Sequence, residues 1–224
     1  MRTTEPKKSV YRPKKNYDYL LIGSGMSALT VGSLLAKAGK TVCILEQNDI
    51  PGGYAHSFKM GDFYFCAEVH YIWGCKPGET IYEFLKKVGL EHEITFEPLD
   101  PEGYDHMVIP GHRVKIPCGY DKLVRNITQE FPADERGIRR FVHVLDNILT
   151  EIRNLPPHIG FKQALTQWYQ FPYLLRYRTK TLQHLFDECR LSPEVQGILA
   201  ANAGDYMLPP KDLSLFAYTA LFGG

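Results

Sequence analysis

Two glycine-rich turns and one acid carry the clearest chemistry in this sequence. The first turn reads Gly-Ser-Gly-Met-Ser-Ala over residues 23–28 and follows the apolar run 17–22. Its two glycines permit a tight turn and let a pyrophosphate approach backbone N–H groups, and Ala28 lets a helix pack close to the strand. A helix that starts there points the positive end of its dipole at the phosphates. Glu46 lies 21 residues after Gly25, where its carboxylate can accept hydrogen bonds from both hydroxyls of an adenosine ribose.

The elements that must position these groups follow one another in the required order. Residues 17–22 predict a short strand buried on both faces, as in a parallel sheet. A helix is predicted from the turn to about residue 38, where Gly39 ends it. Residues 41–45 predict a second strand that ends at Glu46. This order predicts a βαβ dinucleotide-binding unit, and the acid favours FAD or NAD over NADP because it would repel a 2′-phosphate.

The second turn, Asp-Ile-Pro-Gly-Gly at residues 49–53, contains two glycines that allow close backbone approach to a ligand. An ordinary glycine turn is the alternative reading. An acid followed after five residues by Gly-Gly, with Ser57 and Phe58 behind it, resembles FAD-binding oxidoreductases of the phytoene desaturase and amine oxidase superfamily. The resemblance implies that this loop runs along the pyrophosphate and ribityl chain of FAD. The expected cofactor-binding residues are Gly23, Ser24, Gly25, Met26, Ser27, Ala28, Glu46, Gln47, Gly52, Gly53, Tyr54 and Ser57.

Later segments sharpen this resemblance. The stretch Ala-Glu-Val-His-Tyr-Ile at 67–72, with its pair His70 and Tyr71, is similar to the retinol saturase and carotenoid isomerase branch of the superfamily. Segments 117–120, 131–135 and 206–210 also look like that branch, so the resemblance extends from about residue 17 to residue 224.

The resemblance implies an FAD-dependent oxidoreductase that desaturates, saturates or isomerises a carotenoid- or retinoid-like polyene. Its partner would be a lipophilic small molecule, and the flavin would exchange a hydride. Two positions depart from the pattern: the branch usually has an acid at the place of Cys66 and a glycine at the place of Glu68. A carboxylate near the flavin could alter the cofactor geometry.

Two rival functions remain open. One is an amine-oxidase-type flavoenzyme that uses the same cofactor on a polar substrate. The other is a catalytically incompetent fragment that keeps only the dinucleotide-binding turn. No catalytic side chain is assigned, because a histidine such as His70 between apolar residues is more often part of a core or a turn.

Composition and charge indicate an ordinary globular protein. The chain has 224 residues, 44% of them hydrophobic and 23% charged, and a net charge of +1, so no nucleic-acid partner is expected. Five scattered cysteines without a Cys-x-x-Cys spacing predict neither a disulfide framework nor a metal site. With no signal peptide or transmembrane run predicted, we expect a cytoplasmic or peripherally membrane-associated protein. The basic segment 1–16 is interpreted as a solvated tail, with weak attraction to anionic lipid as the alternative.

The later chain is predicted to be mostly helical. Helices are expected at residues 81–88, 122–131 and 136–153, and a hairpin at 106–116. Aromatic and basic residues interleave over 161–190, which predicts either a helical core face with its bases reaching solvent or a surface that docks on a membrane.

The predicted fold class is α/β: a Rossmann-like FAD/NAD(P)-binding βαβ unit with an inserted, mostly helical α+β substrate region. The expected divisions are a flexible tail at 1–16, the N-terminal part of the FAD domain at 17–66 and a partial substrate region at 67–224. Only two strands of the nucleotide sheet are predicted, and two strands are not expected to be stable alone. We therefore expect an incomplete sheet and an incomplete chain, with a naturally shortened domain as the alternative.

Overall fold

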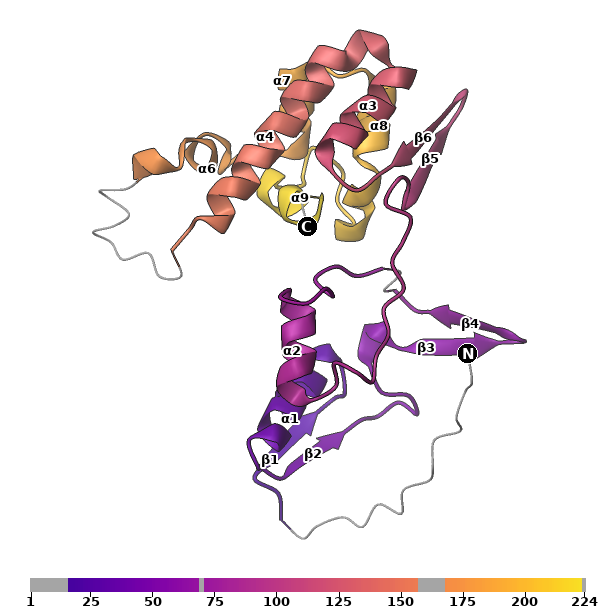
Figure 1. Cartoon of the computed structure of the whole chain (residues 1–224), viewed down its shortest axis with the longest axis vertical. Coiled ribbons are helices and arrows are strands. Elements are labelled where there is room, and N and C mark those ends of the chain that lie inside the picture. The colour runs from indigo at the N-terminus through magenta and orange to yellow at the C-terminus, as the bar shows by residue number, and fades with distance from the viewer. Residues whose placement is uncertain (1–15, 69–70, 157–167, 223–224) are drawn as a thin grey trace. The chain divides into compact units, whose positions relative to one another are not determined.

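The computed structural model describes residues 16–68, 71–156 and 168–222, which belong to two compact units divided after Phe96 (Figure 1). Three predicted segments fall wholly or partly outside these residues: residues 1–15 of the basic tail, Val69 with His70, and residues 161–167 at the start of the aromatic-basic stretch 161–190. The predicted boundary after residue 66 divides the chain by function and stays a prediction.

The first unit contains a parallel strand pair, two helices and a hairpin. Its elements are β1 (Tyr19–Ile22), α1 (Met26–Lys37), β2 (Val42–Leu45), the 3₁₀ turn η1 (Gly53–Ala55), β3 (Ser57–Met60), β4 (Phe63–Cys66) and α2 (Thr80–Val88). The second unit contains a hairpin followed by helices. Its elements are β5 (Asp105–Ile109), β6 (His112–Ile116), α3 (Tyr120–Glu130), η2 (Pro132–Asp134), α4 (Glu135–Arg153), η3 (Trp168–Gln170), α6 (Pro172–Tyr177), α7 (Leu182–Cys189), α8 (Pro193–Leu199), η4 (Ala201–Tyr206) and α9 (Leu215–Phe222).

The predicted βαβ unit is present in the first unit. β1 and β2 pair in parallel, from Tyr19 opposite Val42 to Ile22 opposite Leu45. Between them α1 packs on the strands through Gly32, where a Cβ would lie 3.2 Å from Cδ1 of Ile44. Close helix–strand packing therefore depends on a glycine one turn after Ala28, which the sequence analysis did not single out.

The expectation that β1 is buried on both faces is wrong. Leu20 is 57% exposed and Ile22 is 87% exposed. In the described residues, β1 pairs with β2 in a sheet of two strands, and α1 contacts both of them. No further strand of these residues extends the sheet, so apolar side chains of β1 remain open to solvent.

Two antiparallel hairpins accompany these elements. β5 pairs with β6 through His106 opposite Lys115, which confirms the hairpin predicted at 106–116. β3 pairs with β4 through Phe58 opposite Phe65, a hairpin that the sequence analysis missed. The predicted helix at 81–88 is also confirmed as α2, which ends at Gly89 with a φ of 80°.

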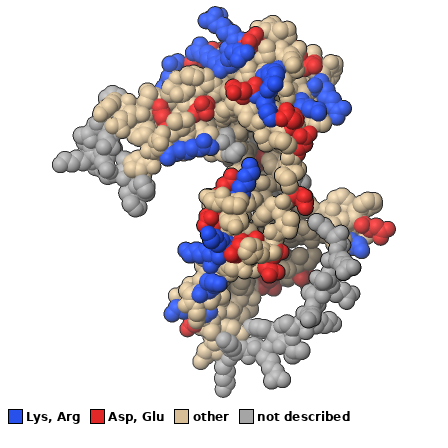
Figure 2. All heavy atoms as spheres, viewed as in Figure 1, with Lys and Arg blue, Asp and Glu red and all other residues tan. Residues whose placement is uncertain are grey.

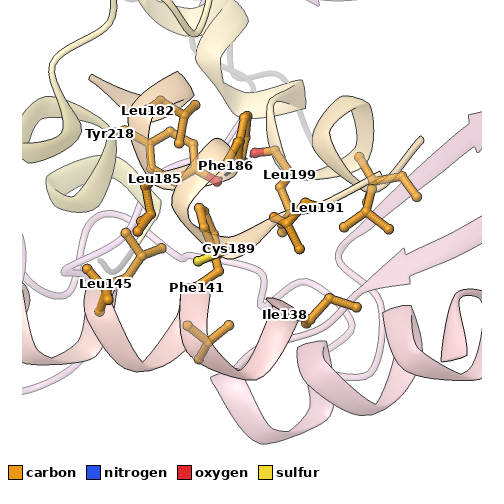
Figure 3. Close-up of a cluster of buried hydrophobic side chains, with 14 of the residues drawn as sticks. Ile138, Phe141, Leu145, Leu182, Leu185, Phe186, Cys189, Leu191, Leu199 and Tyr218 are labelled. Carbon is orange, nitrogen blue, oxygen red and sulfur yellow. Dashed lines mark hydrogen bonds between the residues drawn. The ribbon is translucent and has the colours of Figure 1, made fainter. Parts of the chain in front are cut away.

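The second unit contains the main hydrophobic core, shown in Figure 3. α4 supplies Ile138, Phe141 and Leu145, which are fully buried, as the periodicity of the sequence predicts. Phe141 stacks on Phe186 of α7 at a centroid distance of 5.5 Å. Each such side chain contributes about 1.5–3 kcal/mol relative to exposure, so packing on α4 stabilises this unit. The predicted helices at 122–131 and 136–153 are confirmed as α3 and α4.

One close contact sets the approach of α4 to the end of α7. A Cβ at Gly137 would lie 2.5 Å from the carbonyl oxygen of Cys189 and 2.8 Å from Cδ2 of Leu191. Only a glycine allows this spacing without movement of the neighbouring backbone.

The charges and hydropathy of the described residues add two observations. Basic and acidic side chains are interspersed on the face shown in Figure 2. Within residues 16–68, 71–156 and 168–222, no helix is long and apolar enough to cross a membrane.

Candidate dinucleotide-binding site

The two glycine turns lie against each other at the N-terminal end of α1. The backbone N–H of Gly52 donates to the carbonyl oxygen of Ser24 at 2.9 Å, and Gly25 and Gly52 form an isolated parallel bridge. A Cβ at Gly53 would lie 3.1 Å from Cα of Gly25. Because Gly25, Gly52 and Gly53 have no side chains, two segments distant in sequence can form one surface.

The start of α1 is suited to an anionic group. Gly23 turns the chain with a φ of 88°, and Gly25 is the N-cap in an extended conformation. The cap makes no side-chain hydrogen bond and the first turn contains no acid, so no side chain competes with a ligand for the first N–H groups of α1. A Cβ built on Gly25 would meet nothing within 4 Å, which leaves open space at the same place. These features fit a pyrophosphate.

The carboxylate of Glu46 is held at the end of β2 by residues on both sides. Its Oε2 accepts hydrogen bonds from the backbone N–H and the hydroxyl of Ser24, both at 2.6 Å. Its Oε1 accepts from the backbone N–H of Asn48 at 2.9 Å and from Nδ2 of Asn48 at 3.1 Å. The Ser24 hydroxyl, followed by the backbone N–H groups of Asn48 and Ser24, lowers the pKa of Glu46 from 4.5 to about 2. Glu46 is therefore an ionised, oriented acceptor at neutral pH.

The other predicted site residues differ in their surroundings. Ala28 is half-buried on α1, whereas Met26 and Tyr54 are exposed by 58% and 80%. Ser27, Gln47 and Ser57 are also exposed. The structure thus brings Ser24, Gly25, Glu46, Gly52 and Gly53 together. Among the described residues, it shows no side-chain hydrogen bond from Tyr54 or Ser57 to that group.

Sequence reasoning missed two contributors to this site. Asn48 orients Glu46, as described above. Nδ1 of His56 lies 2.6 Å from the carbonyl oxygen of Gly53, so a protonated Nδ1 donates to the second glycine turn. A polar residue two positions after the acid was the available signal for Asn48. His56 belongs to no sequence motif that would have marked it. Within the described chain, no group of three His, Cys, Asp or Glu side chains could hold a metal.

These turns define the class of domain. Residues 21–88 match the family model described as an NAD(P)-binding Rossmann-like domain. Together with the parallel β1–β2 pair, this match confirms the predicted Rossmann-like α/β fold class.

Known relatives narrow the class. The chain is 26% identical over 227 residues to all-trans-retinol 13,14-reductase of Danio rerio, covering 94% of this chain and 36% of that protein. It is 27% identical over 145 residues to prolycopene isomerase 2, chloroplastic, of an Oncidium hybrid cultivar, covering 63% of this chain and 24% of that protein. A crystal structure of Rab GDI from Plasmodium falciparum overlaps with a TM-score of 0.48 at 15% identity, covering 92% of this chain and 49% of that chain.

The chain's relatives are thus retinol 13,14-reductases and prolycopene isomerases, which confirms the predicted resemblance to the retinol saturase and carotenoid isomerase branch. The chain spans 36% of the length of the retinol reductase that it matches.

Proposed function

We propose that this chain forms part of an FAD-dependent oxidoreductase that desaturates, saturates or isomerises a carotenoid- or retinoid-like polyene. The proposal rests on the contact between the two glycine turns at the start of α1 and on the oriented carboxylate of Glu46 beside them. The names of the relatives, retinol reductase and prolycopene isomerase, support a lipophilic polyene as substrate.

Each part of the site has a role in this proposal. The N–H groups at Gly25, Met26 and Ser27 would bind the pyrophosphate, and Glu46 would exchange its hydrogen bonds to Ser24 for the ribose hydroxyls. The segment from Gly52 to Ser57 would follow the ribityl chain. Bound FAD supplies hydride exchange, and the protein supplies orientation and exclusion of water.

The test has two stages on protein that contains this chain. The first measures the flavin absorbance band and the FAD stoichiometry; protein without flavin affinity would contradict the proposal and favour the incompetent fragment. In the second stage, the flavin-loaded protein is mixed with a carotenoid, a retinoid or an amine. A change of the flavin spectrum with a polyene supports the proposal, whereas a change with the amine alone favours an amine-oxidase-type enzyme.

Peripheral membrane contact through the aromatic-basic stretch is proposed as well. Tyr177 is only 3% exposed and belongs to the core of the second unit, as the core interpretation predicts. Tyr169, Arg178 and Lys180 are exposed and would form the docking surface. Sedimentation with anionic and neutral vesicles tests the contact; equal recovery of the protein with both at low salt would remove it.

A further inference from the structure

We infer that a groove between α4 and α6 is a binding site for a phosphate group. The groove has a volume of about 300 Å³ and is lined by Arg140, His143 and Val144 of α4 and by Tyr173 and Arg176 of α6. α4 and α6 pack against each other within the second unit, so the groove depends on no part of the glycine turns.

Arg140 and Arg176 give the groove two cations for the one acid that they share. The guanidinium groups of Arg140 and Arg176 both donate to the same oxygen, Oε1 of Glu188, at 2.5 Å and 2.8 Å. Tyr177 donates its hydroxyl to that oxygen at 3.2 Å. Two cations that share one carboxylate carry a net charge of +1. Each guanidinium has five N–H donors, so donors remain beyond those that Glu188 accepts.

The two arginines are held in place and still accessible. Cζ of Arg176 lies 5.3 Å from the ring centroid of Tyr177, a cation–π contact that orients the guanidinium. The side chains of Arg140 and Arg176 are 50% and 62% exposed, whereas that of Glu188 is 26% exposed. A ligand can therefore reach the cations from solvent while Glu188 keeps them close together.

A phosphate group matches this arrangement better than a single carboxylate does. It offers several acceptor oxygens to the two guanidinium groups. Its negative charge also offsets the positive charge of the arginines that Glu188 does not neutralise. His143 and Tyr173 contact each other through Nε2 and the hydroxyl at 3.1 Å and add polar groups to the wall. Val144 and the Tyr173 ring give the groove apolar surface for the organic part of a phosphate ester.

The alternative is a structural network in which Glu188 joins α4, α6 and α7. Exposed ion pairs of this kind contribute little to stability. The two interpretations differ in the affinity of the unchanged protein for phosphate. If the arginines only serve the fold, the unchanged protein binds phosphate no better than the Arg140→Gln/Arg176→Gln variant does. If they form an anion site, removal of the competing carboxylate strengthens phosphate binding.

The experiment titrates inorganic phosphate into the full chain and follows arginine Nε–H signals by NMR. Arg140→Gln/Arg176→Gln is expected to lower the affinity at least about tenfold, and Glu188→Gln to raise it. Arg139→Gln is the matched control: it lies on the same helix, is 63% exposed and pairs with Glu135 at 2.8 Å. The control should bind phosphate like the unchanged protein. Unchanged or weaker binding by folded Glu188→Gln, or an equal loss in the control, would overturn the site.

A second arm identifies the source of the phosphate. Sedimentation compares vesicles that contain phosphatidic acid with vesicles of phosphatidylcholine alone. Recovery that depends on phosphatidic acid and on both arginines supports a lipid headgroup, and inorganic phosphate should then compete. Arginine-dependent binding of inorganic phosphate without vesicle recovery supports a soluble phosphate compound. If neither arm depends on Arg140 and Arg176, the inference is wrong.

Discussion

Ser24 donates both its backbone N–H and its hydroxyl to one oxygen of Glu46, at 2.6 Å each. This relationship joins the start of α1 to the end of β2, the two places that the pyrophosphate and the adenosine ribose of a dinucleotide would contact. The serine is 3% exposed, so water does not compete freely for these hydrogen bonds. The acid is therefore oriented before any ligand arrives.

Glu46→Ala is expected to weaken FAD binding at least about tenfold, because the ribose loses an ionised acceptor. The measurement is a fluorescence titration of FAD with protein that contains this chain. Asp62→Ala is the control, since this exposed acid lies in the same unit outside both glycine turns and should leave the affinity unchanged. Equal affinities of Glu46→Ala and the unchanged protein would remove Glu46 from the ribose role.

Ser24→Ala is expected to raise the pKa of Glu46 from about 2 toward 4.5, because it removes the largest cause of the shift. The lowered pKa means that the ionised carboxylate stabilises the fold at pH values above 4.5. That contribution is lost as the pH falls through about 2. Carboxyl-carbon NMR across this range measures the pKa. Ser27→Ala, an exposed serine of the same turn, should leave it unchanged; an unshifted Glu46 in Ser24→Ala would contradict the prediction.

The local pattern predicted the βαβ unit and the long helix well. Glycines, the spacing of apolar residues and a terminal acid reflect the local backbone conformation, which residues close in sequence determine. This local control explains the correct prediction of α1 and α4. Burial was predicted less well: Ile22 has the residue type of a covered strand, but coverage depends on partners that its own sequence does not specify. The same limit applies to Gly32 and Gly137, whose importance comes from atoms of other elements.

The site was predicted at the level of its glycines and its acid. Gly25 and Gly52 are separated by all of α1 and β2, and only the fold shows that they are in contact. Asn48 and His56 were not predicted, because each acts through a hydrogen bond to a neighbouring residue that no sequence motif specifies.

Gly137→Ala is expected to destabilise the protein by about 1–3 kcal/mol, because the added methyl group overlaps the Cys189 carbonyl. Gly197→Ala is a control of opposite sign: this exposed helical glycine of α8 has open space around a Cβ. It should stabilise by about 0.4–1 kcal/mol through the unfolded chain. Urea unfolding measures both variants, and a Gly137→Ala protein as stable as the parent would refute the close contact.

Tyr218→Phe is expected to cost about 1–3 kcal/mol of unfolding free energy, since it leaves a buried acceptor without its donor. The fully buried hydroxyl donates to the carbonyl oxygen of Leu199 at 2.6 Å. Tyr206→Phe removes a similar bond to Ala217 from a side chain that is 37% exposed. Water can replace that partner, so its cost should stay within about 0.5 kcal/mol. Equal losses in the two variants would show that burial does not set the cost.

Hydrogen exchange at the backbone N–H of Gly52 can report how often the two glycine turns separate. This N–H is buried and donates to the carbonyl oxygen of Ser24, and this hydrogen bond joins the two glycine turns. Its proton can exchange with deuterium only while those turns are apart, so the exchange rate of this one amide measures the population of opened sites. A ligand that bridges the turns would slow that exchange in proportion to its occupancy. Deuterium exchange at the Gly52 amide can therefore measure ligand binding without an attached dye.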